Sequence, residues 1–235
     1  MALKENNVVK TSGSTRGFAD MMTDGFGIVT VMNAKVYDVM DDISSTDPTK
    51  AKTPNDIIAA YEDKDGEAKD KYICEIKTLK VANVTQEGPN KTVSGGQYSN
   101  PLIKFGKSAR LEMQDALGTA DVIEALGGGT IGYAEDGSTI NAIHFSEQFA
   151  GPKTIIGDSF FIDQKSGKQV KVKIIFYQFL PDSIFNLTQD AEGDATVFDL
   201  NGDLLTTDVK LTDKDGKNFT LGLFYSIVNP EEATA

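Results

Sequence analysis

The segment KIIFYQFL (173–180) is apolar at both alternating sets of positions. Successive side chains of a strand point to opposite sides of a sheet, so a strand with this pattern needs cover on both faces. One set, Ile174, Phe176 and Leu180, is expected to pack in the core of the domain. The other set consists of Ile175, Tyr177 and Phe179.

Two kinds of cover are possible for that second set. A neighbouring subunit is one, because large exposed apolar patches are rare on monomers. The other is the chain itself, if 173–180 is an ordinary central strand buried on both faces. The pattern alone leaves both alternatives open, and the first makes Ile175, Tyr177 and Phe179 candidate subunit-interface residues.

Alternation of apolar and polar residues predicts strands along most of the chain. The segment 26–39 predicts a long strand with a bulge near Asn33, and 107–116 predicts a half-exposed strand with Ala109, Leu111 and Met113 inward. Other strands are expected at 71–84, 140–149, 154–163, 169–180, 195–200 and 218–227. Gly-containing segments at 163–169 and 212–218 predict hairpin turns between them.

Only one short helix is expected, in TADVIEALGGG (119–129), with Val122, Ile123 and Leu126 on one face and Gly127 at its end. The segment 41–71 has two prolines, many small polar residues and one apolar cluster, Ile57 and Ile58. It predicts an extended loop with little structure of its own, a kind of loop that is usually functional or disordered. The fold expected from the sequence is therefore mainly β, an antiparallel β-sandwich with one flanking helix.

Charge and composition limit the possible functions. The 235 residues carry 23 Lys and Arg against 35 Asp and Glu, a net charge of −12, so tight binding of nucleic-acid phosphates is not expected. The first twenty residues lack the apolar region of a secretion signal, and no apolar run approaches the roughly 20 residues of a membrane span. A cytosolic protein without a membrane span is expected, with Cys74 as a small buried hydrophobe.

No motif of the sequence predicts a catalytic, cofactor or metal site. The acid-rich stretch DAEGDATVFDLNGD (190–203) lacks the Gly at position 6 and the Glu at position 12 of a calcium loop, so it predicts two turns around a short strand at 195–200. GGGTIG (127–132) follows a helix, and Gly106-Lys107-Ser108 lacks the first Gly of a phosphate loop. His144, the single histidine, has no nucleophile motif beside it. An enzyme is therefore not expected.

Three segments resemble the major tail tube proteins of long-tailed bacteriophages. They are KTVSGG (91–96), ARLEMQDALGTADVIEAL (109–126) and EGDATVFDLNGDLL (192–205), followed by a β-rich second half, and the likeness spans roughly residues 72–210. The resemblance implies a single β-sandwich domain over 1–235, with an N-terminal arm at about 1–25 and a C-terminal tail at about 229–235. It also implies that the extended loop, with Ile57 and Ile58, contacts the neighbouring ring.

The function implied by this resemblance is structural. Such proteins form hexameric rings that stack into a hollow tube, assembled in the host cytoplasm and kept in the virion. The implied partners are further copies of the chain, other tail proteins, and DNA that passes through the lumen without specific binding. The alternatives are another virion component, of the capsid or baseplate, and a cytosolic ligand-binding β-sandwich.

Overall fold

The structure, a computed structural model, describes residues 26–28, 31–40, 50–63, 65–69, 71–77, 79–88, 90–92, 102–104, 106–115, 119–145, 149–163, 167, 169–182, 186–187 and 198–229. The expected N-terminal arm, 1–25, lies outside the described residues, and so does the tail beyond Asn229.

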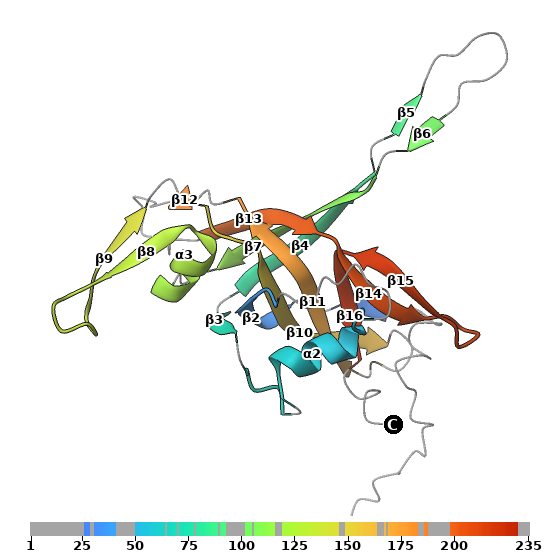
Figure 1. The fold of residues 1–235 in the computed structure, drawn as a ribbon, viewed down its shortest axis with the longest axis horizontal. Coiled ribbons are helices and arrows are strands. Elements are labelled where there is room, and N and C mark those ends of the chain that lie inside the picture. Colours follow the sequence, from blue (N-terminus) through green and yellow to red (C-terminus); the bar gives the residue numbers. More distant parts are fainter. Residues whose placement is uncertain are drawn as a thin grey trace, which may run out of the picture.

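The described chain is mainly β, which confirms the expected class (Figure 1). The strands are β1 (Phe26–Ile28), β2 (Met32–Asp38), β3 (Tyr72–Ile76), β4 (Leu79–Glu87), β5 (Asn90–Thr92), β6 (Leu102–Lys104), β7 (Ser108–Asp115), β8 (Gly129–Tyr133), β9 (Ile140–Phe145), β10 (Lys153–Asp163), β11 (Gln169–Pro181), β12 (Asn186–Leu187), β13 (Phe198–Leu205), β14 (Thr207–Thr212), β15 (Asn218–Leu223) and β16 (Tyr225–Val228). The helices are α2 (Pro54–Tyr61) and α3 (Ala120–Leu126).

One antiparallel sheet dominates, in the order β3-β2-β10-β11-β13-β7-β4. Strand β1 extends it beside β10, β12 beside β13, and β16 beside β11. Three further pairs stand apart as two-stranded sheets, β5–β6, β8–β9 and β14–β15. The strand pairing therefore gives one continuous large sheet with separate hairpins, and does not by itself show the two facing sheets of a sandwich.

The large sheet curls around a first core. Strands β2 and β4 contact each other although four strands separate them along the sheet, so its two ends approach. Buried residues of β2, β3, β7 and β13 meet there, with Val122, Ala125 and Leu126 of α3. Thr119 caps the first turn of α3. Gly127 stands at its end, as the sequence predicts, and the Gly127 N–H donates to Ile123 O.

A second core lies on the opposite face of β10 and β11. It consists of Tyr37, Ile57, Ile58, Tyr61, Ile156, Ile175, Tyr177, Val209 and Val228. Helix α2 and strand β14 supply the cover, so the chain itself buries both faces of β11. Ile175 and Tyr177 have no exposed surface, and neither has Ile57.

A bulge in β11 changes which side chains share a face. Lys153 pairs with Phe179 and Ile155 with Phe176, so β11 carries one more residue than β10 between these pairs. Phe179 therefore lies in the first core with Phe176, not with Ile175 and Tyr177 in the second. The predicted bulge near Asn33 is also found, because β2 pairs out of step with β10 there and Asn33 has φ 49°.

The prediction of an unstructured loop at 41–71 is wrong for the part of this segment that the structure describes. Residues 54–61 form α2, which begins with a capping box between Thr53 and Asp56, and Glu62 then bridges to Ala68. Pro54 at the first helical turn has no N–H to lose, so the proline that suggested a loop is compatible with a helix start. Residues 41–49 lie outside the described part.

The segment Asn201-Gly202-Asp203, expected as a turn, lies inside β13. Gly202 pairs with Pro181 of β11 on one side and with Leu111 of β7 on the other. An Asn-Gly pair is a strong local turn signal, but here the glycine serves a close approach between strands. Residues 190–197, the other acid-rich part of this stretch, lie outside the described residues.

Candidate functional site

The outer face of strands β4, β7 and β13 is a polar surface. Side chains that alternate with the core residues Leu111, Met113 and Leu204 point away from the first core. They are Asn83, Thr85, Glu87, Ser108, Arg110, Glu112, Gln114, Asp199, Asn201 and Asp203. We call this set the outer polar face, and its carboxylates outnumber its cations.

Arg110 is the cation of this set, and two carboxylates hold it. Its Nη1 donates to Asp182 Oδ1 and to Asp203 Oδ1, each at 3.3 Å, and its Nη2 donates to Asp182 Oδ2. The hydrogen bond to Asp182 is the main cause that raises the pKa of Arg110. The guanidinium charge is therefore matched by two carboxylates, and the face keeps a net negative charge from Glu87, Glu112 and Asp199.

A depression of about 260 Å³ lies on this face between Thr85, Glu87, Arg110, Glu112 and Asp203. By residue its lining is mostly polar: three acidic side chains, the paired arginine, Thr85 and Ser108, with Ala109 as the apolar member. Small-molecule sites in proteins are mostly apolar with a few placed polar groups, so this depression has the lining of a solvated surface.

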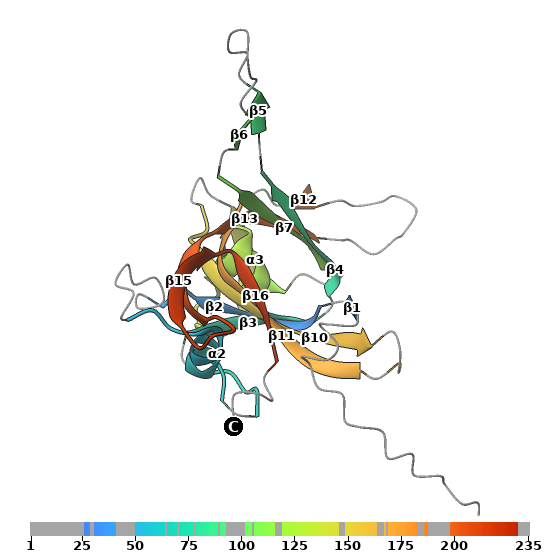
Figure 2. The same ribbon diagram turned by 90° about the vertical axis from the view of Figure 1, so that its right-hand side faces the viewer.

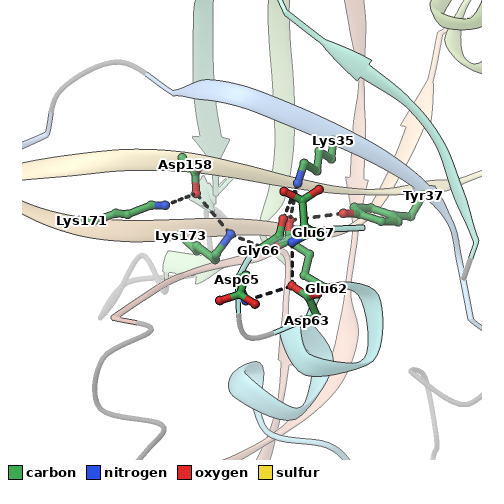
Figure 3. A network of polar contacts seen from close by, with 10 residues as sticks. All are labelled: Lys35, Tyr37, Glu62, Asp63, Asp65, Gly66, Glu67, Asp158, Lys171 and Lys173. Atoms are coloured by element: carbon green, nitrogen blue, oxygen red, sulfur yellow. Dashed lines mark hydrogen bonds and ion pairs between the residues drawn. The ribbon is translucent and has the colours of Figure 1, made fainter. Parts of the chain in front are cut away.

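A second polar cluster is buried, and Figure 3 shows it between the α2 segment and the large sheet. Lys173 Nζ of β11 donates to Glu62 Oε2 at 2.5 Å and to Asp158 Oδ1 of β10 at 3.2 Å. Tyr37 OH of β2 donates to Glu62 Oε1 at 3.2 Å, and Lys35 Nζ donates to the carbonyl oxygen of Gly66. Side chains of β2 and β11 thus meet at Glu62, and Asp158 of β10 joins the cluster through Lys173.

Burial and charge act on these groups in opposite ways. Burial lowers the pKa of Lys173, but its hydrogen bond to Glu62 and the charges of Glu62 and Asp158 together raise that pKa above its usual value. Burial and the neighbouring Glu62 carboxylate both raise the pKa of Tyr37. The cluster is therefore an ion pair with a neutral phenol, and it ties the residues after α2 to the sheet.

The five predicted interface residues are placed inside the chain. Ile57, Ile58, Ile175 and Tyr177 lie in the second core and Phe179 lies in the first. They offer almost no surface to a neighbouring subunit, so the interface prediction is corrected: of the two alternatives, the structure has the strand covered by its own chain. The missing information was that residues 54–61 form a helix that packs on β11.

The near-miss motifs have ordinary structural roles. Gly127 and Gly128 join α3 to β8, which confirms that GGGTIG follows a helix, and Gly128 has φ 70°. His144 is exposed on β9 opposite Thr130, and Cys74 is buried in the first core. The predicted turn at 212–218 is found, because Gly216 N–H donates to Asp213 O and Asp213 Oδ1 accepts from Asp215 and Lys217.

The sequence reading missed Glu62, Lys173 and the pairing of Arg110. Lys173 did carry a signal, because it directly precedes the apolar run 174–177 and a buried lysine needs a carboxylate partner. Within the residues that the structure describes, no group of three or more His, Cys, Asp or Glu side chains is placed to hold a metal ion. No described helix is both long and apolar enough to cross a bilayer.

Comparison with models of known protein families gives no match, and comparison with curated protein sequences gives none either.

Proposed function

We propose that this chain is a structural protein of a bacteriophage virion, a tail tube protein whose copies form stacked hexameric rings around a channel for DNA. Its partners are then further copies of the chain and other tail proteins, and its place is the virion after assembly in the host cytoplasm. The resemblance of residues 72–210 to such proteins gives the class, and the outer polar face is the observation that carries the proposal.

A channel wall for DNA must not hold the phosphates. Lys and Arg bind DNA because they release its condensed counterions, whereas carboxylates repel it. The outer polar face offers Glu87, Glu112 and Asp199, and its one arginine is already paired with Asp182 and Asp203. DNA could slide along such a face, because its phosphates would not meet a series of cations that bind them tightly.

The shape of the chain supports contacts between rings. Strands β4 and β7 continue into β5 and β6, which project away from the body in both ribbon views (Figures 1 and 2). A projecting hairpin can reach a neighbouring ring, a role that the resemblance to tail tube proteins implied for residues 41–71. That segment instead folds back on its own sheet over residues 50–69.

Negative-stain electron microscopy of the purified protein over a range of concentrations tests the proposal. We expect rings with a stain-filled centre, and tubes of stacked rings at high concentration. Closed shells or branched assemblies would instead indicate a capsid or baseplate component. Particles that stay monomeric at all concentrations would overturn an assembly function and favour a ligand-binding protein.

A further inference from the structure

The hairpin β8–β9 has one apolar face that is only partly covered. Residues opposite each other in the pair share a face, so Ile131 and Ile143 lie with Tyr133, Ile140 and Phe145. Helix α3 covers the end near Ile131, which is 7% exposed. The exposed fractions of Tyr133 and Phe145 are 53% and 56%. We call Tyr133, Ile140, Ile143 and Phe145 the first apolar face.

The hairpin β14–β15 repeats this arrangement. Val209 pairs with Leu221 and Leu211 with Phe219, so these four side chains share a face. The β14 side enters the second core, where Val209 is fully buried. The β15 side is open, with Phe219 43% and Leu221 50% exposed. We call Phe219 and Leu221 the second apolar face.

The two faces lie at opposite ends of the molecule. Figure 1 has the longest axis horizontal, with β8–β9 at the left end and β14–β15 at the right. No described element of the chain can therefore cover both faces. A contact between two copies would cover the first apolar face of one copy and the second apolar face of the other.

Charge disfavours contact of the first face with itself. Residues 119–145 contain four carboxylates, Asp121, Glu124, Glu135 and Asp136, and no Lys or Arg. Residues 205–223 contain three Asp and three Lys, Lys210, Lys214 and Lys217, and are neutral in sum. Two copies joined through their β8–β9 ends would bring four carboxylates on each side together, whereas the β14–β15 end offers lysines to them.

We propose that the occupant of the first apolar face is the second apolar face of another copy of this chain. Such a contact is head-to-tail, and a head-to-tail contact between identical chains closes into a ring when its rotation allows. This inference rests on the proposed function and adds to it the pair of surfaces that joins neighbours within a ring.

Two variants test the contact, Phe145→Asp on the first face and Leu221→Asp on the second. Both side chains are at least half exposed, so each variant should fold. Each substitution should weaken self-association by roughly 30-fold or more, because it puts a charge in the centre of the contact. Each variant alone should therefore be monomeric in analytical ultracentrifugation.

Mixing the two variants is the decisive measurement. Phe145→Asp keeps an intact second face and Leu221→Asp keeps an intact first face, so a 1:1 mixture should give heterodimers and nothing larger. Thr130→Asp and Thr220→Asp put the same charge on the polar faces of the same hairpins and should leave assembly unchanged. Tyr133→Asp and Phe219→Asp repeat the test at a second position of each face if either first variant fails to fold.

Absence of heterodimers in the mixture overturns the inference, and so does assembly of either variant alone. Failure of the proposed function looks different. If heterodimers form but the wild-type protein gives shells or solid fibres, the contact stands and the tube does not. If the wild type gives hollow tubes and both variants still assemble, the tube stands and the contact lies elsewhere.

Discussion

Gly202 of β13 pairs with Pro181 of β11, just beyond the bulge in that strand. A Cβ atom at this position would stand well under 3.0 Å from the carbonyl oxygen of Leu180 and 2.6 Å from Phe179 Cε2. The obstacle is partly backbone, so it cannot move aside as the end of a flexible side chain could. This explains why a glycine in a turn-like sequence stands in the middle of a strand.

Gly202→Ala should therefore destabilise the protein by about 1–3 kcal/mol, the usual cost of overpacking a core. Urea unfolding followed by circular dichroism measures the change. Gly106→Ala is the matched control, because a Cβ there has no heavy atom within 4 Å, and it should stay within about 0.5 kcal/mol of the wild type. Equal stability of both variants would mean that β11 and β13 do not approach as closely as described.

Three buried groups give the free energy of unfolding the same dependence on alkaline pH. Burial raises the pKa of Tyr177 to about 12, although its hydrogen bond with Ser226 lowers it. The pKa of Tyr37 and that of Lys173 are also raised. In each case the folded state keeps its proton above the pH at which the unfolded chain loses it, so stability is full below about pH 10 and falls as the pH rises further.

We expect the free energy of unfolding to drop between pH 10 and pH 12, with roughly 2–3 kcal/mol of the drop from Tyr177. In Tyr177→Phe this contribution should disappear and the slope of stability against pH should become shallower. Tyr133→Phe changes a half-exposed tyrosine and serves as the control. Urea unfolding at a series of pH values measures the slopes, and identical slopes for wild type and Tyr177→Phe would contradict the burial of that phenol.

Among the elements, α2 and the turn after it show how a polar segment is fixed to a sheet. Ile57, Ile58 and Tyr61 give it an apolar face for the second core. Glu62 then supplies a carboxylate, 2% exposed, to Lys173. A buried charge without a partner is expensive, so the pair strongly favours this one placement of the segment.

Glu62→Gln and Lys173→Met should each cost about 3 kcal/mol, because each leaves a charged partner buried. The double variant should cost at least about 1 kcal/mol less than the sum of the two, since neither buried charge of this pair then remains. Urea unfolding of the four proteins completes the cycle. The pair Glu75 and Lys77, 4.0 Å apart and more exposed, is the control, with a coupling below about 0.5 kcal/mol. Additive costs at Glu62 and Lys173 would show that they do not interact.

Local sequence patterns predicted the elements better than their partners. The alternation in 107–116 gave the inward set Ala109, Leu111 and Met113, and all three are buried. The helix at 119–129 was also predicted, because its cap and its apolar spacing are local. The position of Phe179 in the first core was not predicted, because the bulge that places it there depends on how β11 pairs with β10. The cover of β11 by α2 is likewise a contact between distant segments.

At the scale of the whole molecule, the net charge of −12 would act on the proposed assembly and on DNA in its channel. Self-repulsion opposes assembly at low ionic strength and is screened at about 0.1 M salt, where the Debye length is about 10 Å. In the proposed assembly, the apolar faces of the two hairpins would then supply the attraction between copies. The outer polar face remains charged and solvated, which suits a wall that faces a channel.

That wall gives the last prediction. In the proposed tube, every ring repeats the outer polar face, so Glu112→Lys places a ring of unpaired cations in the channel. Tubes assembled in the presence of short duplex DNA should then retain DNA that is protected from nuclease, because repeated lysines bind phosphates through counterion release. Wild-type tubes should retain none, and the DNA held by the variant should be released as the salt concentration rises.

Glu67→Lys is the control for this experiment, because it makes the same charge change at an exposed residue away from the outer polar face. Its tubes should behave as the wild type does. DNA retained equally by both variants would show that net charge, and not the position of Glu112, governs the result. If neither variant retains DNA although both form tubes, strands β4, β7 and β13 do not line the channel, and the acidic face must look outward, where repulsion between neighbouring tubes would be its consequence.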